Sequence, residues 1–268
     1  MNKEYATDYT VPELLASFLS HDLEDGEEMI VGAGTPIARA AVLLAHITRA
    51  PNMKLLLAYS VTNLINVPVM AAFDTEIDYR QANWAEAYFV DEDLVMQIKR
   101  WATRRRMFVG ALQIDKYGNS NLIGIGDDCR HLRVRGAGAV GSPTPSSSAK
   151  CYYLLVNSHS KRIFVEKCDF ISSFGWGDGG LDQRKKLGLV GGGPKYVLTP
   201  LCIMDFEEKT KRMRLKSLHG GATVTDVTNN TGFELIVSEE VPQTAPPTKK
   251  EIELLRTRID TAGLLRSI

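Results

Sequence analysis

The sequence VGAGTPIARAAVLLAHITRAPNMKLLLAYS, residues 31–60, decides the fold of this chain. A short apolar run ends at Val31, and Thr35 and Pro36 then supply the N-cap and the first-turn proline of a helix. Apolar residues follow helical spacing up to Pro51, and the next run, MKLLLAY, has the length and composition of a strand. The stretch therefore predicts a strand, a helix and a parallel second strand, which together form the unit of an α/β fold.

Size, charge and cysteine content limit the class of protein. The chain has 268 residues, of which 44% are apolar and 24% are charged, so we expect one large domain over residues 1–268. Its 32 basic and 32 acidic residues cancel, so neither nucleic acid nor a membrane surface is expected as a partner. The four cysteines show no Cys-x-x-Cys spacing and the N-terminus has no apolar signal segment, which predicts a cytoplasmic protein with reduced thiols.

The rest of the chain predicts further strands and loops. Residues 84–107 favour a polar helix, with the arginines at positions 104–106 at its solvated end, and FVGALQI favours a buried strand. LCIMDFEEKTKRMRLKSLH alternates in the manner of a hairpin, and WGDGGLDQRKKLGLVGGGPKY is a long glycine-rich segment of the kind that often carries function. Near the C-terminus, Thr248 and Glu251 predict a helix that begins with a capping box.

Two glycine-rich segments could present backbone N–H groups to an anion. In VGAGTP, Ile37 stands where a dinucleotide-binding fingerprint has its third glycine, and no acidic residue near Tyr59 could bind a ribose, which disfavours NAD. A tight strand-to-helix turn is the other interpretation of this segment. RGAGA, residues 135–139, could hold an oxyanion or could be an ordinary surface turn, and the residues alone leave both open. None of the five histidines has a spacing suited to zinc, so no metal site is expected.

Seven segments in the same order carry a resemblance to one family. They are VGAGTP, FVGALQIDKYGNSN, RVRGAGA, KRIFVEKCDFISSFGW, MDFEEKTKRMRLKSLH, NNTGFEL and IELLRTRID. Together they resemble the β subunit of family I coenzyme A transferases, nearest to the glutaconate CoA-transferase type. The resemblance implies the CoA-transferase fold, an α/β fold with an open, mostly parallel sheet flanked by helices. It also implies a separately encoded α-type subunit, an α2β2 assembly and an acyl-CoA site between the subunits.

The resemblance also implies a change at the reacting residue. In the transferases a β-subunit glutamate attacks the thioester and carries CoA, and that glutamate matches Ala58, whose methyl group cannot be a nucleophile. HSKRIFVE, SLHGGAT and the C-terminal helix resemble the CoA-transferase-like hydrolases that open the last steroid rings. Those enzymes also lack the glutamate, and they cleave a carbon–carbon bond of a cyclic β-diketone with water and a base from the α subunit.

These similarities imply a set of site residues and three possible functions. The expected site residues are Gly136, Ala137 and Gly138 as backbone oxyanion donors, Tyr59 and Ser60 at the position of the lost nucleophile, and Gly32, Gly34, Gln113 and Asn119 as substrate contacts. Asp115 and Asn119 are also expected to fix the turn in QIDKYGN. The chain is then a subunit of a carbon–carbon hydrolase, of a CoA transferase with a displaced nucleophile, or of an enzyme in which it is non-catalytic. Coenzyme A enters as part of the substrate, and no other cofactor is expected.

Overall fold

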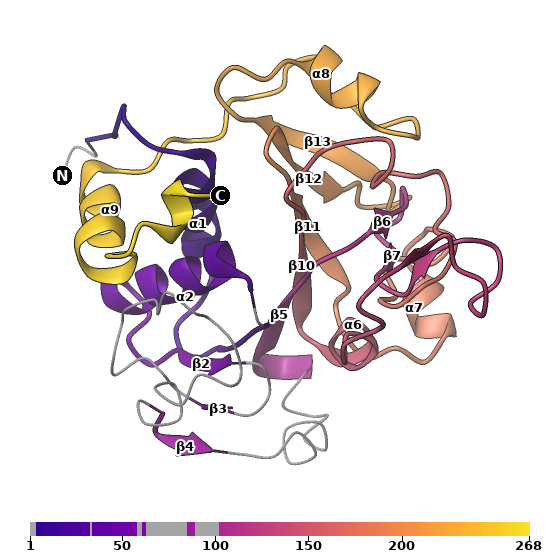
Figure 1. The fold of residues 1–268 in the computed structure, drawn as a ribbon, viewed down its shortest axis with the longest axis horizontal. Helices are drawn as coiled ribbons and strands as arrows, with labels where there is room; N and C mark the ends of the chain where they lie inside the picture. The colour runs from indigo at the N-terminus through magenta and orange to yellow at the C-terminus, as the bar shows by residue number, and fades with distance from the viewer. Residues whose placement is uncertain (1–3, 33, 58–60, 63–84, 89–101) are drawn as a thin grey trace. The chain divides into compact units, whose positions relative to one another are not determined.

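The computed structural model of the chain falls into two compact units (Figure 1). The first comprises Met1–Gln97 with Ala245–Ile268, and the second comprises Ile98–Thr244. The expected single domain over residues 1–268 stays a prediction. The structure describes residues 4–32, 34–57, 61–62, 85–88 and 102–268. None of the helices in these ranges is both long and apolar enough to cross a membrane.

The first unit contains the strand–helix–strand predicted from residues 31–60. Its elements are α1 (Val11–Asp22), β1 (Glu28–Val31), α2 (Pro36–Thr48), β2 (Lys54–Leu57), β3 (Val61–Thr62), β4 (Ala87–Tyr88), α9 (Lys249–Leu254), the π-helical η2 (Leu255–Ile259) and the 3₁₀ turn η3 (Leu264–Arg266). β1 and β2 are parallel, as predicted, and β3 and β4 continue the sheet in antiparallel pairs. α2 begins at Pro36 after the N-cap Thr35, and its apolar face is buried next to α1.

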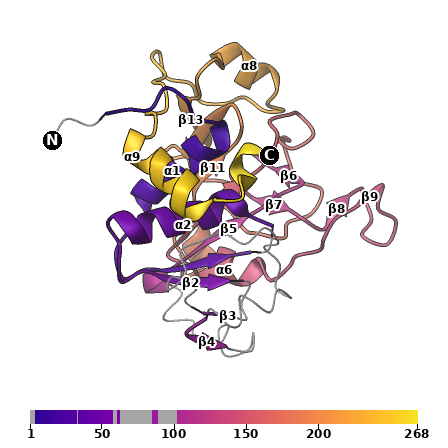
Figure 2. The same cartoon turned by 60° about the vertical axis from the view of Figure 1, so that its left-hand side comes forward.

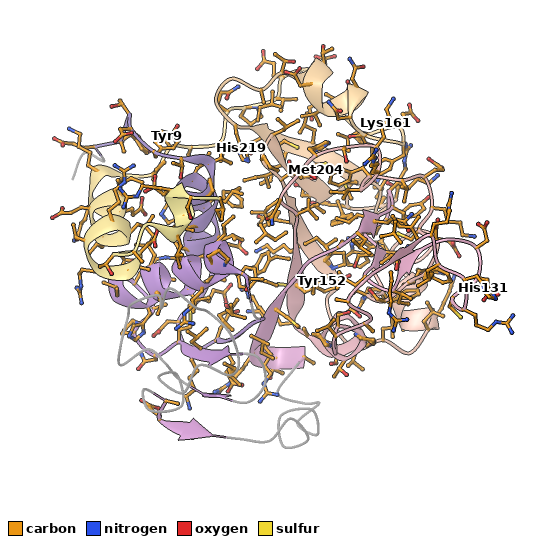
Figure 3. The ribbon with its side chains drawn as sticks, in the orientation of Figure 1. Tyr9, His131, Tyr152, Lys161, Met204 and His219 are labelled. Atoms are coloured by element: carbon orange, nitrogen blue, oxygen red, sulfur yellow. The ribbon has the colours of Figure 1, made fainter. Side chains whose placement is uncertain are left out.

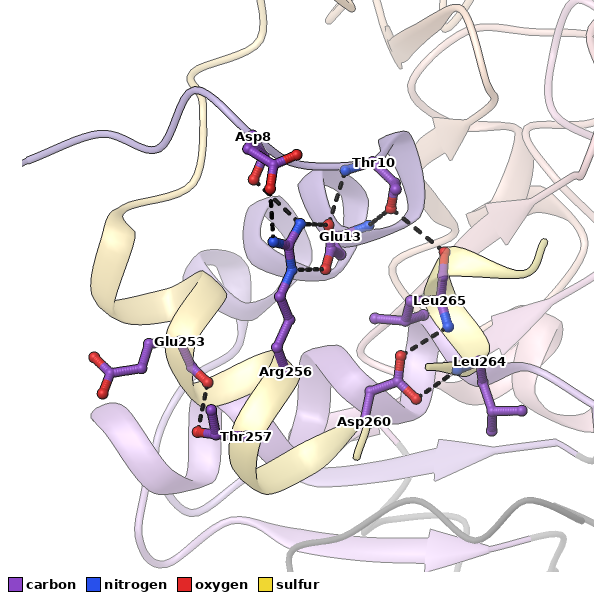
Figure 4. A network of polar contacts seen from close by, with 9 residues as sticks. All are labelled: Asp8, Thr10, Glu13, Glu253, Arg256, Thr257, Asp260, Leu264 and Leu265. Atoms are coloured by element: carbon purple, nitrogen blue, oxygen red, sulfur yellow. Dashed lines mark hydrogen bonds and ion pairs between the residues drawn. The ribbon is translucent and has the colours of Figure 1, made fainter. Parts of the chain in front are cut away.

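The C-terminal segment closes the first unit through a polar network (Figure 4). Arg256 donates to both carboxylate oxygens of Glu13, at 2.8 and 3.0 Å, and also to Asp8. Glu13 completes a capping box with Thr10 at the start of α1. Burial alone would raise the pKa of Glu13, but the hydrogen bonds from Arg256 and Thr10 hold it below its ordinary value. The predicted capping box of Thr248 and Glu251 at the start of α9 is confirmed.

Replacing Arg256 with methionine should lower the free energy of unfolding by about 2 kcal/mol, because the buried Glu13 carboxylate loses its charged partner. Urea unfolding of the variant measures this loss. Arg258→Met is the matched control, since Arg258 lies exposed in the same turn. Equal losses in both variants would show that the ion pair contributes nothing.

The second unit holds a larger mixed sheet and two small hairpins. Its elements are β5 (Arg105–Val109), β6 (Gln113–Ile114), β7 (Ser120–Asn121), β8 (Gly124–Ile125), β9 (Val134–Arg135), α6 (Pro143–Ser148), β10 (Cys151–Leu155), α7 (Gln183–Lys186), β11 (Pro194–Leu198), β12 (Cys202–Phe206), β13 (Met213–Leu218) and α8 (Val224–Asn229). The order is β13–β12–β11–β10–β5, with parallel pairs β5–β10 and β10–β11 and the predicted hairpin β12–β13. Figure 2 shows the β8–β9 hairpin extending outward from the body of this unit. The expected α/β class with a mostly parallel sheet flanked by helices is confirmed.

The arginine run corrects the prediction of a solvated helix end. Arg105 and Arg106 begin β5, where they are almost completely buried, and the helical turn ends at Arg104. The Arg106 guanidinium donates to the Tyr153 hydroxyl on β10 at 2.6 Å. The prediction was wrong because the pairing of β5 with β10 is a long-range contact that local charge patterning does not report.

Candidate functional site

The turn in QIDKYGN is fixed by hydrogen bonds to Asp115, as predicted. Its carboxylate accepts from the backbone N–H groups of Tyr117 and Asn119, at 2.9 and 3.1 Å, and from the Asn119 side-chain amide at 2.8 Å. Burial raises the pKa of Asp115, although these hydrogen bonds partly offset the effect. The short segment between β6 and β7 is therefore held rigidly by a nearly buried carboxylate.

Asn119 connects this turn to the glycine-rich segment that follows β10. Its Oδ1 accepts from the N–H groups of Gly175 and Gly177, at 2.9 and 3.3 Å, and its Nδ2 donates to Asp115 and to the Gly177 carbonyl oxygen at 2.8 Å. The amide thus uses its two donors and accepts twice inside the chain. A direct substrate contact of this side chain stays a prediction, and it would require one of these bonds to break.

Gln113 is held beside the same turn. Its Oε1 accepts from the Asn121 amide at 2.7 Å and from the Asp169 N–H at 3.0 Å. Asn121 in turn donates to the Gly124 carbonyl oxygen and accepts from the Ile123 N–H. These bonds fix the chain from β7 into β8. Residues 136–138, called the glycine segment below, lie against this stretch.

The three expected oxyanion donors differ in their hydrogen bonding. The Gly136 N–H donates to the Ile123 carbonyl oxygen at 2.9 Å, and the Gly138 N–H donates to the Leu122 carbonyl oxygen at 3.1 Å. Ala137 is exposed between them, and among the described residues its N–H has no acceptor. Of the three donors, Ala137 is therefore the one that can bind an oxyanion without breaking a bond within the chain.

The backbone around Gly136 also leaves no room for a side chain, which the sequence did not indicate. A Cβ at this position would lie 2.0 Å from the Leu122 carbonyl oxygen and 2.7 Å from Leu112 Cδ1. Any larger residue must displace the backbone, so a substitution at Gly136 should lower the stability of the chain. At Gly138 the space is open, but its φ of 84° disfavours other residues.

The structure brings together only part of the predicted site. Gln113, Asn119 and the glycine segment belong to one continuous hydrogen-bonded arrangement in the second unit. Gly32 and Gly34 lie in the first unit, before α2, where the Thr35 hydroxyl donates to the Gly32 carbonyl oxygen at 2.6 Å. The predictions for Ala58, Tyr59 and Ser60 fall on residues 58–60, which lie outside the described residues.

Arg184 is a structural anchor that sequence reasoning missed. Its nearly buried guanidinium donates to the carbonyl oxygens of Phe174, Gly175, Ser146 and Gly191, at 2.6 to 3.0 Å. The Tyr152 hydroxyl on β10, labelled in Figure 3, also donates to the Phe174 carbonyl oxygen, at 3.0 Å. No local pattern in QRKK distinguishes this arginine from its exposed lysine neighbours, because its acceptors come from three separate segments.

A cysteine and a histidine lie close together in the second unit, in buried surroundings that disfavour a thiolate–imidazolium pair. Cys202 Sγ lies 3.7 Å from His159 Nδ1, and both side chains are buried. Burial raises the pKa of Cys202 to about 12 and lowers the pKa of His159 to about 4. The thiol therefore stays protonated and the imidazole stays neutral near pH 7. In the described ranges no group of three or more His, Cys, Asp or Glu residues could hold a metal ion.

Comparisons with known proteins agree with the family that the sequence resembles. The family model described as coenzyme A transferase matches residues 13–230. The B-subunit of the 3-oxoadipate CoA-transferase of Pseudomonas knackmussii is 35% identical, over 92% of both chains. The B-subunit of the glutaconate CoA-transferase of Acidaminococcus fermentans is 33% identical over 95% of this chain and 94% of its own.

A third relative is named for a different activity. The IpdB subunit of the cholesterol ring-cleaving hydrolase of Mycobacterium tuberculosis is 30% identical over 95% of this chain and 96% of its own. Among solved structures, glutaconate coenzyme A-transferase from A. fermentans superposes with a TM-score of 0.86 and 30% identity, over 99% of this chain and 100% of that one. The chain is thus similar over nearly its whole length both to transferase subunits and to a hydrolase subunit.

Proposed function

Because this chain belongs to the coenzyme A transferase family, as a β-type subunit, we propose that it serves a heteromeric enzyme that hydrolyses a carbon–carbon bond of an acyl-CoA. The substrate class is a cyclic β-diketone that carries the CoA thioester, as in steroid-ring degradation. One observation carries the proposal: alanine stands at position 58, where the transferases of the resemblance have the glutamate that carries CoA. An enzyme without that carboxylate must use another acceptor, and water is the simplest one.

The proposed reaction uses water without a covalent enzyme intermediate. A base from the α-type partner takes a proton from water, and the water oxygen attacks one ring carbonyl carbon. The bond between that carbon and the carbon between the two carbonyls then breaks. Its electron pair leaves as the enolate of the second carbonyl, which takes up a proton. The products are a new carboxylate and a ketone, while the CoA thioester stays intact.

In this chain the glycine segment supplies the electrostatic part of the mechanism. Negative charge develops on the attacked carbonyl oxygen, and a fixed N–H donor stabilises it. Ala137 offers such a donor, since its N–H has no acceptor among the described residues, and the bonds of Gly136 and Gly138 hold the segment in place. The contacts expected of Gly32, Gly34, Gln113, Tyr59 and Ser60 with substrate belong to the same proposal.

CoA transfer between carboxylic acids is the second candidate. It is supported by the two relatives that are named as CoA-transferases and are 33 to 35% identical. Because position 58 is alanine, transfer would require a carboxylate from another position of this chain or from its partner to take the role of the missing glutamate. A non-catalytic role is the third candidate, and it predicts that the partner alone turns over the substrate.

We propose that an α-type subunit completes the active site. The proposed assembly is α2β2. Three relatives are named as single subunits of larger enzymes, which supports a partner chain. The second unit also leaves several large apolar side chains exposed, as expected for a chain that functions in a complex. These are Val134, Ile171, Leu181, Leu187 and Val190.

The test compares the isolated chain with its complex with the α-type subunit. The isolated chain should be inactive. The complex should open a cyclic β-diketone CoA ester in the absence of any carboxylate acceptor. Borohydride added with the substrate should not inactivate the complex, because no enzyme-bound thioester forms. Turnover that requires an acceptor, together with borohydride inactivation, would contradict the proposal in favour of transfer. Full turnover by the partner alone would establish the non-catalytic role.

A further inference from the structure

A tight turn at residues 139–142 contains an unusual backbone conformation. The Ser142 N–H donates to the Ala139 carbonyl oxygen at 2.9 Å, which closes a turn with Val140 and Gly141 at its centre. Both central residues have positive φ, 48° and 70° respectively, the pattern of a type I′ turn. Glycine, asparagine and aspartate are the residues that normally occupy these positions.

Valine is poorly suited to the first central position. A β-branched side chain crowds the backbone at positive φ, and such a conformation persists only where the surroundings enforce it. Burial within this chain does not compensate, because 59% of Val140 is exposed. Neither local conformation nor packing in the described part of the chain therefore accounts for a valine here.

The surroundings prevent this turn from relaxing. On its N-terminal side the Gly138 N–H donates to the Leu122 carbonyl oxygen. On its C-terminal side the Ser142 hydroxyl donates to the carbonyl oxygens of Ala139 and Ser172, at 2.7 and 3.4 Å. The turn is thus fixed at both ends, and Val140 is held at its centre with more than half of its surface exposed.

The position of this turn places Val140 within reach of a ligand bound at Ala137. Val140 follows Ala137, the proposed oxyanion donor, by three residues, which span at most about 11 Å of chain. A ring system attached to the carbonyl bound by Ala137 extends over a comparable distance. A branched, uncharged side chain offers only apolar contact, so it suits the carbon skeleton of an acyl group and not its polar ends.

We propose that Val140 determines specificity by packing against the apolar ring part of the acyl group bound at the glycine segment. This inference rests on the proposed function for the location of the acyl group, but not on whether the reaction is hydrolysis or transfer. The strained turn then serves to present the valine to the substrate, as is common where strain is kept at functional sites.

Binding measurements on the assembled complex test the proposal, with two CoA esters as probes. Val140→Asn tolerates positive φ, so it should raise the thermal midpoint of the chain by about 2–4 °C. The same variant should weaken binding of cyclohexanecarbonyl-CoA about tenfold and leave acetyl-CoA unchanged. Val140→Gly should give the same two results. Because binding is measured, the result does not depend on the outcome of the hydrolysis test.

Two control variants test whether the exposure of a valine or a positive φ is enough to change the affinity for the two esters. Val134→Asn changes an exposed valine with extended backbone in β9, and Lys211→Asn changes the other non-glycine residue with positive φ among the described residues. Both should leave the affinity ratio of the two esters unchanged. An unchanged ratio in the Val140 variants would overturn the proposal. So would a loss of affinity for the α-type subunit with an unchanged ratio, which would make Val140 a partner contact.

Discussion

Asn119→Leu should lower the thermal midpoint by about 10 °C and reduce turnover of the assembled enzyme at least a hundredfold. The substitution removes four side-chain hydrogen bonds and leaves the Asp115 carboxylate and backbone groups of Gly175 and Gly177 without these partners. Each buried group left unpaired costs about 1–3 kcal/mol, so a total near 4 kcal/mol is a low estimate. At about 2–4 °C per kcal/mol for a chain of this size, this gives the expected shift.

The expected loss of turnover has a different cause from the loss of stability, namely displacement of the proposed oxyanion donor. Asn119 directly precedes β7, and the residues that follow β7 accept the hydrogen bonds that hold the segment of Ala137, so we expect its loss to move the Ala137 donor by more than catalysis tolerates. Asn230→Leu is the matched control, because Asn230 is exposed and bonds only near its own helix, α8. Normal turnover by Asn119→Leu at a temperature where it is folded would show that the network has no part in catalysis.

Stability should fall steeply between pH 6.5 and pH 4, because two buried histidines are neutral in the folded chain. His219 is held between the Thr199 carbonyl oxygen and the Thr244 hydroxyl, at 3.0 and 3.1 Å. His159 lies between the hydroxyls of Thr199 and Thr231, at 3.0 and 3.1 Å. Burial lowers the pKa of each histidine from 6.5 to about 4.

The direction of the effect follows from proton binding. Between pH 6.5 and 4 the unfolded chain binds more protons at these two positions than the folded chain does, so acid favours unfolding. The stabilisation is complete above pH 6.5 and is lost as the pH falls through this window. At about 1.4 kcal/mol per pKa unit, the two histidines together remove about 4 kcal/mol at pH 5.

Urea unfolding at pH 7 and pH 5 measures this dependence. The double variant His159→Gln with His219→Gln should be less stable at pH 7 but should lose much less stability between the two pH values. His131→Gln is the control, since His131 lies exposed on the loop between β8 and β9 (Figure 3). Equal losses in the double variant and the unchanged protein would contradict the assignment of the acid sensitivity to these histidines.

Local sequence patterns predicted the elements whose cause is local. The strand–helix–strand of residues 31–57 and the capping box at Thr248 follow from periodicity and from neighbouring side chains, and both are confirmed. Thr35 holds the predicted N-cap position, but its hydroxyl donates to the Gly32 carbonyl oxygen and makes no cap hydrogen bond. The turn held by Asp115 belongs to the same class, because its partners lie within four residues.

Features that depend on long-range pairing could not be predicted in this way. Arg105 and Arg106 are buried because β5 pairs with β10, more than forty residues away in sequence. The steric requirement at Gly136 arises from Leu122 in the loop between β7 and β8, and the role of Arg184 arises from carbonyl groups of three segments. The resemblance to a family supplied the general location of the candidate site, but not which of its N–H groups are already bonded within the chain.

The most direct test of the proposed hydrolysis follows the oxygen of water. A cyclic β-diketone CoA ester is incubated with the assembled enzyme in water labelled with heavy oxygen, and the product is analysed by mass spectrometry. Hydrolysis predicts one labelled oxygen in the newly formed carboxylate and an intact CoA thioester, with no carboxylate acceptor present. Ring opening without label, or transfer of CoA to an added carboxylate through a trapped glutamyl thioester, would contradict it.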